Sequence, residues 1–279
     1  MGSRDSGGNQ VSATLLESNG NSLGESYLHM IDVEKYRASA SEKARVADLF
    51  RIMPRGRTSV LEIGARDGYL SRPLTEYFQE VTALDLEKPP FEFPGVTTIA
   101  GDVTKLQFGD ESFDCVFCAE VLEHISAVEQ ACRELARVAR HEVIIGVPFL
   151  QDIRMNRSTC RRCGKSNPPW GHVNTFDERR LTMLFPGLSI SRKSFVGLTK
   201  ERSNAVSAML MDLAGNPWGT YVQDEPCIYC GESLAQPSYD RAFLSKVCSG
   251  VAIRLDRLQM AFSRPHANWI HIVFSKDRN

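Results

Sequence analysis

Runs of apolar residues alternate with stretches of helical periodicity between residues 59 and 148. The apolar runs are SVLEIG (59–64), VTALDL (81–86), VTTIAG (96–101), FDCVFC (113–118) and EVIIGVP (142–148). Helical patterns over residues 70–79 and 127–140 separate two pairs of these runs. Strands that alternate with helices are typical of βαβ units, in which a parallel sheet is covered on both faces. The pattern therefore predicts an α/β fold with a doubly wound, mostly parallel sheet.

The flanking sequence adds further elements. A helical pattern over residues 38–53 precedes the first run, with Ser41 as its expected N-cap. After the fifth run, we expect a helix near residues 177–185 and a strand near 188–197. Two helical stretches follow, and NWIHIVFSK (268–276) alternates like a final strand. The two late strands bring the predicted sheet to seven strands.

Composition and charge narrow the classes of protein that fit this pattern. Lys and Arg total 33 and Asp and Glu total 34, a net charge of −1 that excludes a dedicated nucleic-acid coat protein. The longest apolar run, residues 143–150, is far shorter than the roughly 20 residues of a membrane-spanning helix. Residues 1–24 are rich in Gly, Ser and Asn and lack the apolar core of a signal peptide. We therefore expect a disordered lead and a cytoplasmic protein with no membrane span.

Glycines and carboxylates follow the first three strands of the predicted sheet. Gly64 and Gly68 lie in the turn after the first run, where they let a ligand approach the backbone and a helix pack closely. Asp85, at the end of the second run, is placed to bind both hydroxyls of a ribose. Asp102, after the third run, can accept a hydrogen bond from an exocyclic amine such as adenine N6. Because ligands bind beyond the carboxyl ends of parallel strands, these residues predict a nucleotide-binding site.

Residues 58–148 resemble a class I S-adenosylmethionine-dependent methyltransferase, which has a Rossmann-like fold, and in particular its small-molecule branch. The resemblance implies that Glu62 and Gly64 flank the methionine end of S-adenosylmethionine and that Asp85 holds its ribose. A dinucleotide dehydrogenase would share the glycine turn and Asp85, but it has no role for Asp102. The cofactor-binding residues that the resemblance implies are Glu62, Gly64, Ala65, Gly68, Asp85, Leu86, Asp102, Val103, Ala119 and Glu120.

The same resemblance assigns the residues nearer the adenine and the reacting methyl group. It implies that Asp102 and Val103 frame the adenine, whereas Ala119 and Glu120 line the reaction face. One position departs from the family pattern, because Arg66 stands where a third glycine is common. We expect the Arg66 side chain to turn to solvent, which leaves the motif intact.

Two histidines are candidates for a proton acceptor. In the implied reaction an oxygen, nitrogen or carbon of the substrate attacks the sulfonium methyl group, so the enzyme mainly aligns the reactants. If the nucleophile is a hydroxyl, His124 or His172 would accept its proton. Alternatively, His124 only forms a hydrogen bond at the start of a helix, and Glu62 only caps the helix that follows it.

Four of the eight cysteines form two CxxCG repeats, Cys160-Arg-Arg-Cys163-Gly164 and Cys227-Ile-Tyr-Cys230-Gly231. A two-residue gap lets both thiolates of a repeat face one cation, so two such knuckles complete a tetrahedral zinc site, which we expect to be structural. A redox pair is the alternative, but redox pairs stand at helix N-termini and neither segment has that pattern. The other four, Cys115, Cys118, Cys132 and Cys248, are predicted to be core thiols.

The long segment between the two knuckles predicts two insertions that leave the sheet, a first excursion over 149–176 and a second excursion over 198–266. We expect a lead over 1–24, helices and the cofactor-binding half over 25–148, a first insertion with one knuckle over 149–176, a helix and strand over 177–197, a second insertion with the other knuckle and helices over 198–266, and the final strand over 267–279. In the family's topology, both insertions open at the cofactor-binding edge. Zinc would therefore staple the two insertions into a lid that influences substrate choice.

A basic run lies in the first insertion, formed by Arg154, Arg157, Arg161, Arg162 and Lys165. Such a run is usually a solvated face, but inside the pocket it would favour a phosphorylated or carboxylated substrate. Trp170 would either supply an aromatic wall to the pocket or pack against the zinc knuckle.

Three functions remain open on the sequence alone. We expect methyl transfer to a small molecule, for example to a hydroxyl of a sugar, a glycolipid precursor or a secondary metabolite. An RNA methyltransferase whose basic zinc-bearing insertion contacts phosphates is the alternative, although the near-neutral charge argues against a nucleic-acid partner. The third is a non-catalytic protein that binds S-adenosylmethionine, which the intact cofactor motifs disfavour.

Overall fold

The structure, a computed structural model, describes residues 33–236 and 243–276. The disordered lead expected over residues 1–24 lies outside the described residues. Two compact units make up the chain, residues 1–43 and residues 44–279. The sheet and every candidate site residue belong to the second unit.

Helix α2, Ala40–Arg51, corresponds to the helix expected over residues 38–53. Its first turn is capped by Ser39, whose hydroxyl oxygen accepts a hydrogen bond from the Glu42 backbone N–H at 3.2 Å. The prediction of Ser41 as the N-cap was wrong, because the helix begins one residue before Ser41.

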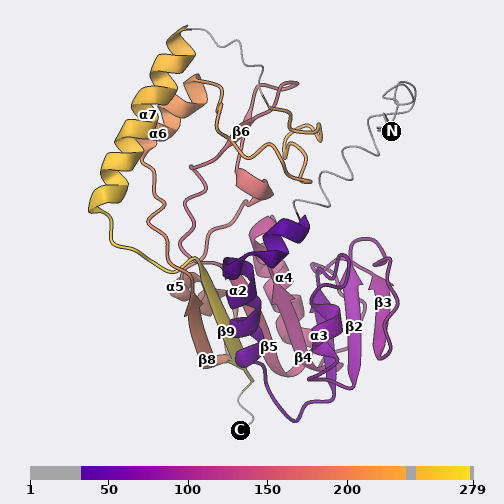
Figure 1. The fold of residues 1–279 in the computed structure, drawn as a ribbon. Helices are drawn as coiled ribbons and strands as arrows, with labels where there is room; N and C mark the ends of the chain where they lie inside the picture. The colour runs from indigo at the N-terminus through magenta and orange to yellow at the C-terminus, as the bar shows by residue number, and fades with distance from the viewer. Residues whose placement is uncertain (1–32, 237–242, 277–279) are drawn as a thin grey trace, which may run out of the picture. The chain divides into compact units, whose positions relative to one another are not determined.

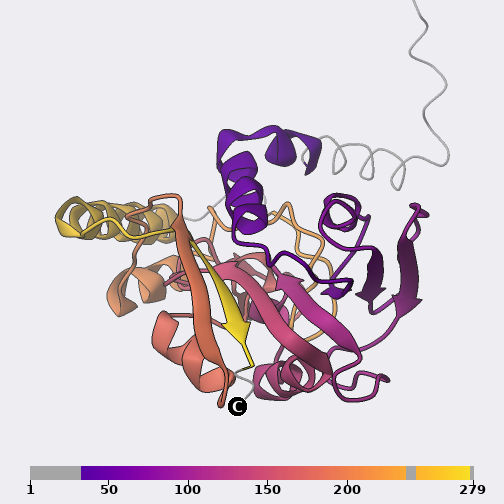
Figure 2. The ribbon, with the colours of Figure 1, turned by 90° about the horizontal axis from the view of Figure 1, so that it is seen from below.

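A seven-stranded sheet forms the centre of the second unit (Figures 1 and 2). Its strands are β1 (Ser59–Ile63), β2 (Glu80–Asp85), β3 (Val96–Ala100), β4 (Phe113–Ala119), β5 (Ala139–Pro148), β8 (Ser189–Val196) and β9 (Trp269–Ser275). They are ordered β3-β2-β1-β4-β5-β9-β8, and only β9 runs antiparallel to its neighbours. The prediction of a mostly parallel seven-stranded sheet is therefore confirmed.

Helices pack on both faces of this sheet. These helices are α3 (Ser71–Leu74), α4 (Val128–Val138) and α5 (Glu178–Leu184), whereas α6 (Ala205–Leu213) and α7 (Phe243–Phe262) pack on each other away from the sheet (Figure 1). One apolar core joins α4 and α5 to one sheet face, and a second core joins α3 and the later part of α2 to the opposite face. Among the described residues, no helix is both long enough and apolar enough to cross a membrane.

Helix α3 is much shorter than the helix expected over residues 70–79. It ends at Leu74, after which the N–H groups of Thr75, Glu76 and Tyr77 bond to carbonyls three residues earlier rather than four. This tighter winding still buries Leu74 and Phe78 in the core. The apolar spacing that predicted a helix therefore marks a helical turn followed by tight turns.

The cysteines predicted to be core thiols fall into two groups. Cys115 and Cys118 are fully buried on opposite sheet faces, because residues three apart in a strand alternate in direction. Cys132 is buried on α4, and burial raises its pKa to about 12. Cys248 on α7 is only half-buried, so its assignment to the core was wrong.

Candidate functional site

The turn after β1 is held against the end of β2. The backbone N–H of Gly64 donates to the Leu84 carbonyl at 2.8 Å. The Asp85 carboxylate accepts from the backbone N–H groups of Arg66, at 2.8 Å, and Leu86, at 2.7 Å. The Leu86 side chain is exposed and Asp85 is partly buried. The two backbone hydrogen bonds hold the Asp85 carboxylate at the carboxyl edge of the sheet.

The two glycines of this turn have different neighbours. Gly64 has a φ of +76°, and a Cβ there would overlap the side chain of Val121. At Gly68, with a φ of +82°, a Cβ would lie within 2.9 Å of the rings of Phe91 and Phe93. Both positions require glycine for conformation and for space. Sequence reasoning missed the two phenylalanines, whose rings stack 4.8 Å apart beside the loop.

Glu62 is buried on β1, and its carboxylate accepts a hydrogen bond from the Ser71 hydroxyl. Burial raises the pKa of Glu62 from 4.5 to about 7. The hydrogen bond from Ser71 lowers this pKa, and the negative charge of Asp85 raises it. Glu62 thus bonds to a side chain in the first turn of α3, but among the described residues no side chain caps the backbone N–H groups of that helix.

The third strand ends in a loop shaped by Asp102. Its carboxylate accepts from both the backbone N–H and the hydroxyl of Thr104, each at 2.8 Å. Val103 is buried in the core, whereas Asp102 is exposed. The backbone N–H of Gly101 donates to the Asp85 carbonyl at 2.7 Å, which fixes the ends of β2 and β3 together.

Arg66 connects the glycine turn to the second excursion. It has a φ of +46°, and its guanidinium forms an ion pair with Asp224 at 2.8 Å. Both side chains are exposed, so the pair is worth little to stability. The expectation that the Arg66 side chain turns to solvent was incomplete, because this side chain also pairs with Asp224, which is distant in sequence.

Glu120 begins the turn that follows β4. Its backbone is in the left-handed region at φ +57°, and its N–H donates to the Gly146 carbonyl at 2.9 Å. One carboxylate oxygen lies 3.8 Å from a guanidinium nitrogen of buried Arg45. Ala119, the last residue of β4, is buried beside Gly146.

The structure brings together His124 and His172, the two candidate proton acceptors. Their rings lie 4.6 Å apart and perpendicular. His172 shares a 2.6 Å hydrogen bond between its Nδ1 and the Gln151 Oε1. Burial lowers the pKa of His124 to about 4 and that of His172 to about 3. Both imidazoles are therefore neutral at neutral pH and able to accept a proton or bind a metal.

Glu123 is the residue of this turn that sequence reasoning missed. It lies in a short 3-10 helix, Leu122–His124, and is fully buried. Among the described residues, neither of its carboxylate oxygens has a hydrogen-bond partner. Burial, and then the charge of Glu120, raises its pKa well above the usual range. The signal in the sequence was an acid inside the apolar VLEHI segment, which was interpreted through its histidine alone.

The four cysteines of the two knuckles converge on one point. Their sulfur atoms all lie within 4.8 Å of one another, and the Cys160–Cys230 and Cys163–Cys227 pairs are each separated by 3.6 Å. Tetrahedral zinc with bonds of about 2.3 Å separates its sulfur ligands by roughly 3.8 Å. All four thiols are free rather than joined in disulfides. The donor set and spacing therefore fit zinc.

Both knuckles repeat the same backbone pattern. In the first, the Gly164 N–H donates to the Cys160 carbonyl at 2.9 Å, and in the second Gly231 donates to Cys227 at 2.9 Å. Both glycines have a φ of +70°. Burial alone would raise the pKa of Cys227, but hydrogen bonds to its sulfur from backbone N–H groups lower that pKa to about 6. A thiolate, the form that binds metal, is thus favoured there.

The basic run is engaged within the chain. Arg157 pairs with Asp212 at 2.8 Å and Arg162 with Glu232 at 3.2 Å, so both contact the second excursion. The remaining partners are Asp152 and the Ser203 carbonyl for Arg154, the Gln236 carbonyl for Arg161 and the Tyr229 ring for Lys165. These contacts favour a role in joining the two excursions over a role in binding an anionic substrate.

The first excursion also packs against the turn that carries Glu123 and His124. The backbone N–H groups of Val173 and Asn174 donate to the Glu123 carbonyl at 2.8 and 3.1 Å. The Asn174 amide donates to the carbonyls of Leu122, at 3.1 Å, and Ile125, at 2.7 Å. Trp170 stands 5.9 Å from the His172 ring, on the side of the histidines. These contacts place part of the excursion directly over the end of β4.

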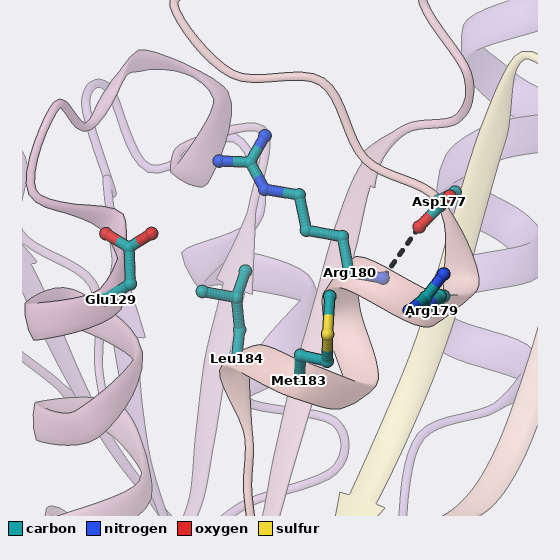
Figure 3. A pocket seen from close by; sticks show the side chains of 6 residues that line it. All are labelled: Glu129, Asp177, Arg179, Arg180, Met183 and Leu184. Atoms are coloured by element: carbon teal, nitrogen blue, oxygen red, sulfur yellow. Dashed lines mark hydrogen bonds between the residues drawn. The ribbon is translucent and has the colours of Figure 1, made fainter.

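Arg180 on α5 holds the end of the first excursion in place through hydrogen bonds to Asn174 and Thr175. Its guanidinium donates to the Asn174 side-chain oxygen at 2.8 Å and to the Thr175 carbonyl at 2.7 Å. A hollow of about 430 Å³ opens between α4 and α5, lined by Glu129, Asp177, Arg179, Arg180, Met183 and Leu184. In Figure 3, the Arg180 side chain lies between Glu129 and Asp177, and the Asp177 carboxylate accepts a hydrogen bond from the backbone N–H of Arg180. None of the predicted site residues lines this hollow.

Comparison with known proteins identifies one matching family. Residues 61–146 match the family model described as a methyltransferase domain. An uncharacterized methyltransferase, YcgJ of Bacillus subtilis, is 33% identical over 93 residues, which cover 30% of this chain and 37% of that protein. Demethylmenaquinone methyltransferase of Renibacterium salmoninarum is 33% identical over 86 residues, covering 29% and 36%. The similarity thus spans less than two fifths of these relatives' length.

Solved structures share the fold across most of the chain. A structure from a complex of the Haloferax volcanii Trm112 methyltransferase activator with a methyltransferase aligns with a TM-score of 0.50 and 12% identity, covering 91% of this chain and 98% of that one. Burkholderia thailandensis 1,6-didemethyltoxoflavin-N1-methyltransferase, solved with S-adenosylhomocysteine, has a TM-score of 0.50 and 14% identity, covering 92% and 88%. The chain therefore has the fold of S-adenosylmethionine-dependent methyltransferases, and its residues 61–146 match a methyltransferase domain.

Proposed function

We propose that the protein is a class I S-adenosylmethionine-dependent methyltransferase that acts on a small molecule. The observation that carries this proposal is the pair of carboxylates, Asp85 and Asp102, at the ends of adjacent strands beside the Gly64 turn. A ribose and an adenine offer hydroxyl and amine donors that match these two acceptors. The match of residues 61–146 to a methyltransferase domain supports the same assignment.

The chain's own residues would bind and orient the methyl donor. S-adenosylmethionine supplies a methyl group already activated by its sulfonium charge. Glu62 and the glycine turn would hold the methionine end, while Ala119 and Glu120 would line the reaction face. The protein's main contribution is then alignment of the acceptor with the methyl group, which can lower a barrier by roughly 7–11 kcal/mol.

For the acceptor we propose a hydroxyl of a sugar, a glycolipid precursor or a secondary metabolite. His124 and His172 lie together beside the end of β4, and we propose that either accepts the hydroxyl proton. The first excursion, which carries His172 and covers the His124 turn, would keep the acceptor out of bulk water.

The cysteine cluster would hold one structural zinc ion. Cys160 and Cys163 come from the first excursion, and Cys227 and Cys230 from the second. Zinc at this point would fasten residues 149–176 to residues 198–266 and so shape the acceptor side of the site. We propose that this lid, rather than the cofactor-binding edge, determines substrate choice.

The RNA methyltransferase alternative depended on the basic run. The Arg157 guanidinium is largely buried and paired with Asp212, so it is not available to phosphates, whereas the exposed Arg162 pairs only weakly with Glu232. RNA binding that weakens steeply with salt would support this alternative over the small-molecule proposal.

A calorimetric titration of S-adenosylhomocysteine tests the proposal. Asp85→Ala removes a carboxylate that would bind the ribose, so we expect affinity to fall by about tenfold or more, the size of a lost charged hydrogen bond. Glu87→Ala, at an exposed carboxylate two residues further along, should leave affinity unchanged. Equal affinity of the wild type and Asp85→Ala would refute the role of Asp85.

A further inference from the structure

We propose that Glu123, His124 and His172 form a binding site for a divalent metal ion, separate from the cysteine cluster. One ligand atom from each of the three residues lies within 4.8 Å of the other two. The four cysteine sulfurs satisfy the same spacing. A cation with bonds of about 2.1 Å holds neighbouring ligand atoms roughly 3.0–3.4 Å apart, so rotations of the three side chains would complete the site.

Glu123 is the strongest indication that something is bound here. Its side chain is fully buried, and among the described residues both carboxylate oxygens lack a hydrogen-bond partner. Buried polar groups in folded proteins are almost always paired, because an unpaired one loses its hydration without compensation. Glu120 adds a second carboxylate to the same turn, and the Arg45 guanidinium, 3.8 Å from Glu120, supplies one positive charge for the two. A cation beside Glu123 would supply the missing partners and balance the remaining negative charge.

The histidines are oriented as metal-binding histidines are. The Nδ1 atom of His172 lies 2.6 Å from the Oε1 atom of Gln151. Because an amide oxygen can only accept a hydrogen bond, His172 donates its Nδ1–H in this contact. That tautomer leaves the lone pair of Nε2 available for a metal. Such a second hydrogen bond is typical of histidine ligands, because it fixes the ring and its tautomer. Gln151 is therefore a positioning residue.

Two imidazoles and one carboxylate select the kind of ion. This donor set suits borderline divalent ions such as Zn²⁺, Mn²⁺ or Co²⁺, and differs from the four thiolates of the other cluster. Three protein ligands leave positions open for an acceptor oxygen. The site follows β4 directly, next to Glu120. This role rests on the proposed function, whereas the binding of the ion does not.

With the ion bound, the histidine nitrogens that hold it could not also accept a proton, so the ion would bind the acceptor hydroxyl and favour loss of its proton to water instead. The oxygen would then attack the sulfonium methyl group. An O–C bond forms, the S–C bond breaks, and its electron pair stays on sulfur to give neutral S-adenosylhomocysteine.

Manganese binding to the intact, zinc-loaded protein tests the inference. Mn²⁺ prefers carboxylate and imidazole ligands to thiolates, so the cysteine cluster should not compete for it. Titration followed by calorimetry and by electron paramagnetic resonance should show about one Mn²⁺ per chain. Glu123→Gln and His124→Ala should each weaken binding by more than about tenfold, and Gln151→Leu by about tenfold. Glu129→Gln, at an exposed carboxylate six residues from Glu123, should not change it.

S-adenosylhomocysteine binding and circular dichroism on the same samples separate the possible outcomes. His124 is only partly buried, so His124→Ala keeps the test valid if Glu123→Gln fails to fold. S-adenosylhomocysteine binding without Mn²⁺ binding, or Mn²⁺ affinity equal in the wild type and both ligand variants, would overturn the metal site and leave the proposed function standing. Mn²⁺ binding that depends on these residues, without binding of S-adenosylhomocysteine, would support the metal site and refute the function.

Discussion

At the scale of single residues, the site combines groups that a sequence displays with groups that only folding reveals. The placement of Asp85 and Asp102 at adjacent strand ends could be predicted, because a carboxylate after a buried strand has a defined place in a parallel sheet. Glu123 could not, since its importance lies in complete burial without a hydrogen-bond partner. The ion pair of Arg66 with Asp224 was equally hidden, because the partners are far apart in sequence.

Glu62 gives a prediction about pH. Its pKa rises from 4.5 to about 7 on folding, so the folded protein holds a proton that the unfolded chain has lost between these values. The resulting stabilisation is complete below pH 4.5, falls as pH rises, and is lost above pH 7, with a total on the order of 3 kcal/mol. Glu62→Gln should remove this part of the pH dependence of the free energy of unfolding.

Urea denaturation at several pH values between 4.5 and 7 measures the effect. Glu76→Gln, at an exposed carboxyl on the same segment, should keep the wild-type pH dependence. Parallel curves for Glu62→Gln and the wild type would show that Glu62 is ionised when folded.

At the scale of elements, the hydrophobic pattern predicted all seven strands of the sheet, whereas element ends depended on local contacts. Helix α3 ends at Leu74, because the following residues wind more tightly while still burying Phe78. Strand β5 begins at Ala139, directly after α4 and earlier than its apolar run indicated. The pairing of the two knuckles was predictable, because their CxxCG repeats match and the glycines have the same conformation.

Metal content tests the pairing of the knuckles. We expect about one zinc ion per chain, measured by elemental analysis of protein purified under reducing conditions. Cys163→Ser removes one ligand and should lose the zinc, and limited proteolysis should then cut within residues 149–176 and 198–236. Cys248→Ser, at a half-buried cysteine outside the cluster, should retain both zinc and resistance to proteolysis. Wild-type protein that is stable without metal would contradict the structural role of zinc.

At the scale of the whole molecule, the site is assembled from both halves of the sequence. The proposed cofactor-binding edge comes from β1 to β4, within the part that matches a methyltransferase domain. The proposed acceptor side is built by the two excursions, which contact the Arg66 turn and the Glu123 turn. Motifs in the sequence therefore carry the proposal for the methyl donor, whereas the proposal for the acceptor depends on packing between segments distant in sequence.

A crystal structure with S-adenosylhomocysteine tests the central claim most directly. The ribose should bind to the Asp85 carboxylate, the adenine should lie against Asp102 and Val103, and the sulfur should face the Glu123 turn. If S-adenosylhomocysteine fails to bind, or binds away from the ends of β1 and β2, the assignment of the protein as an S-adenosylmethionine-dependent methyltransferase is contradicted.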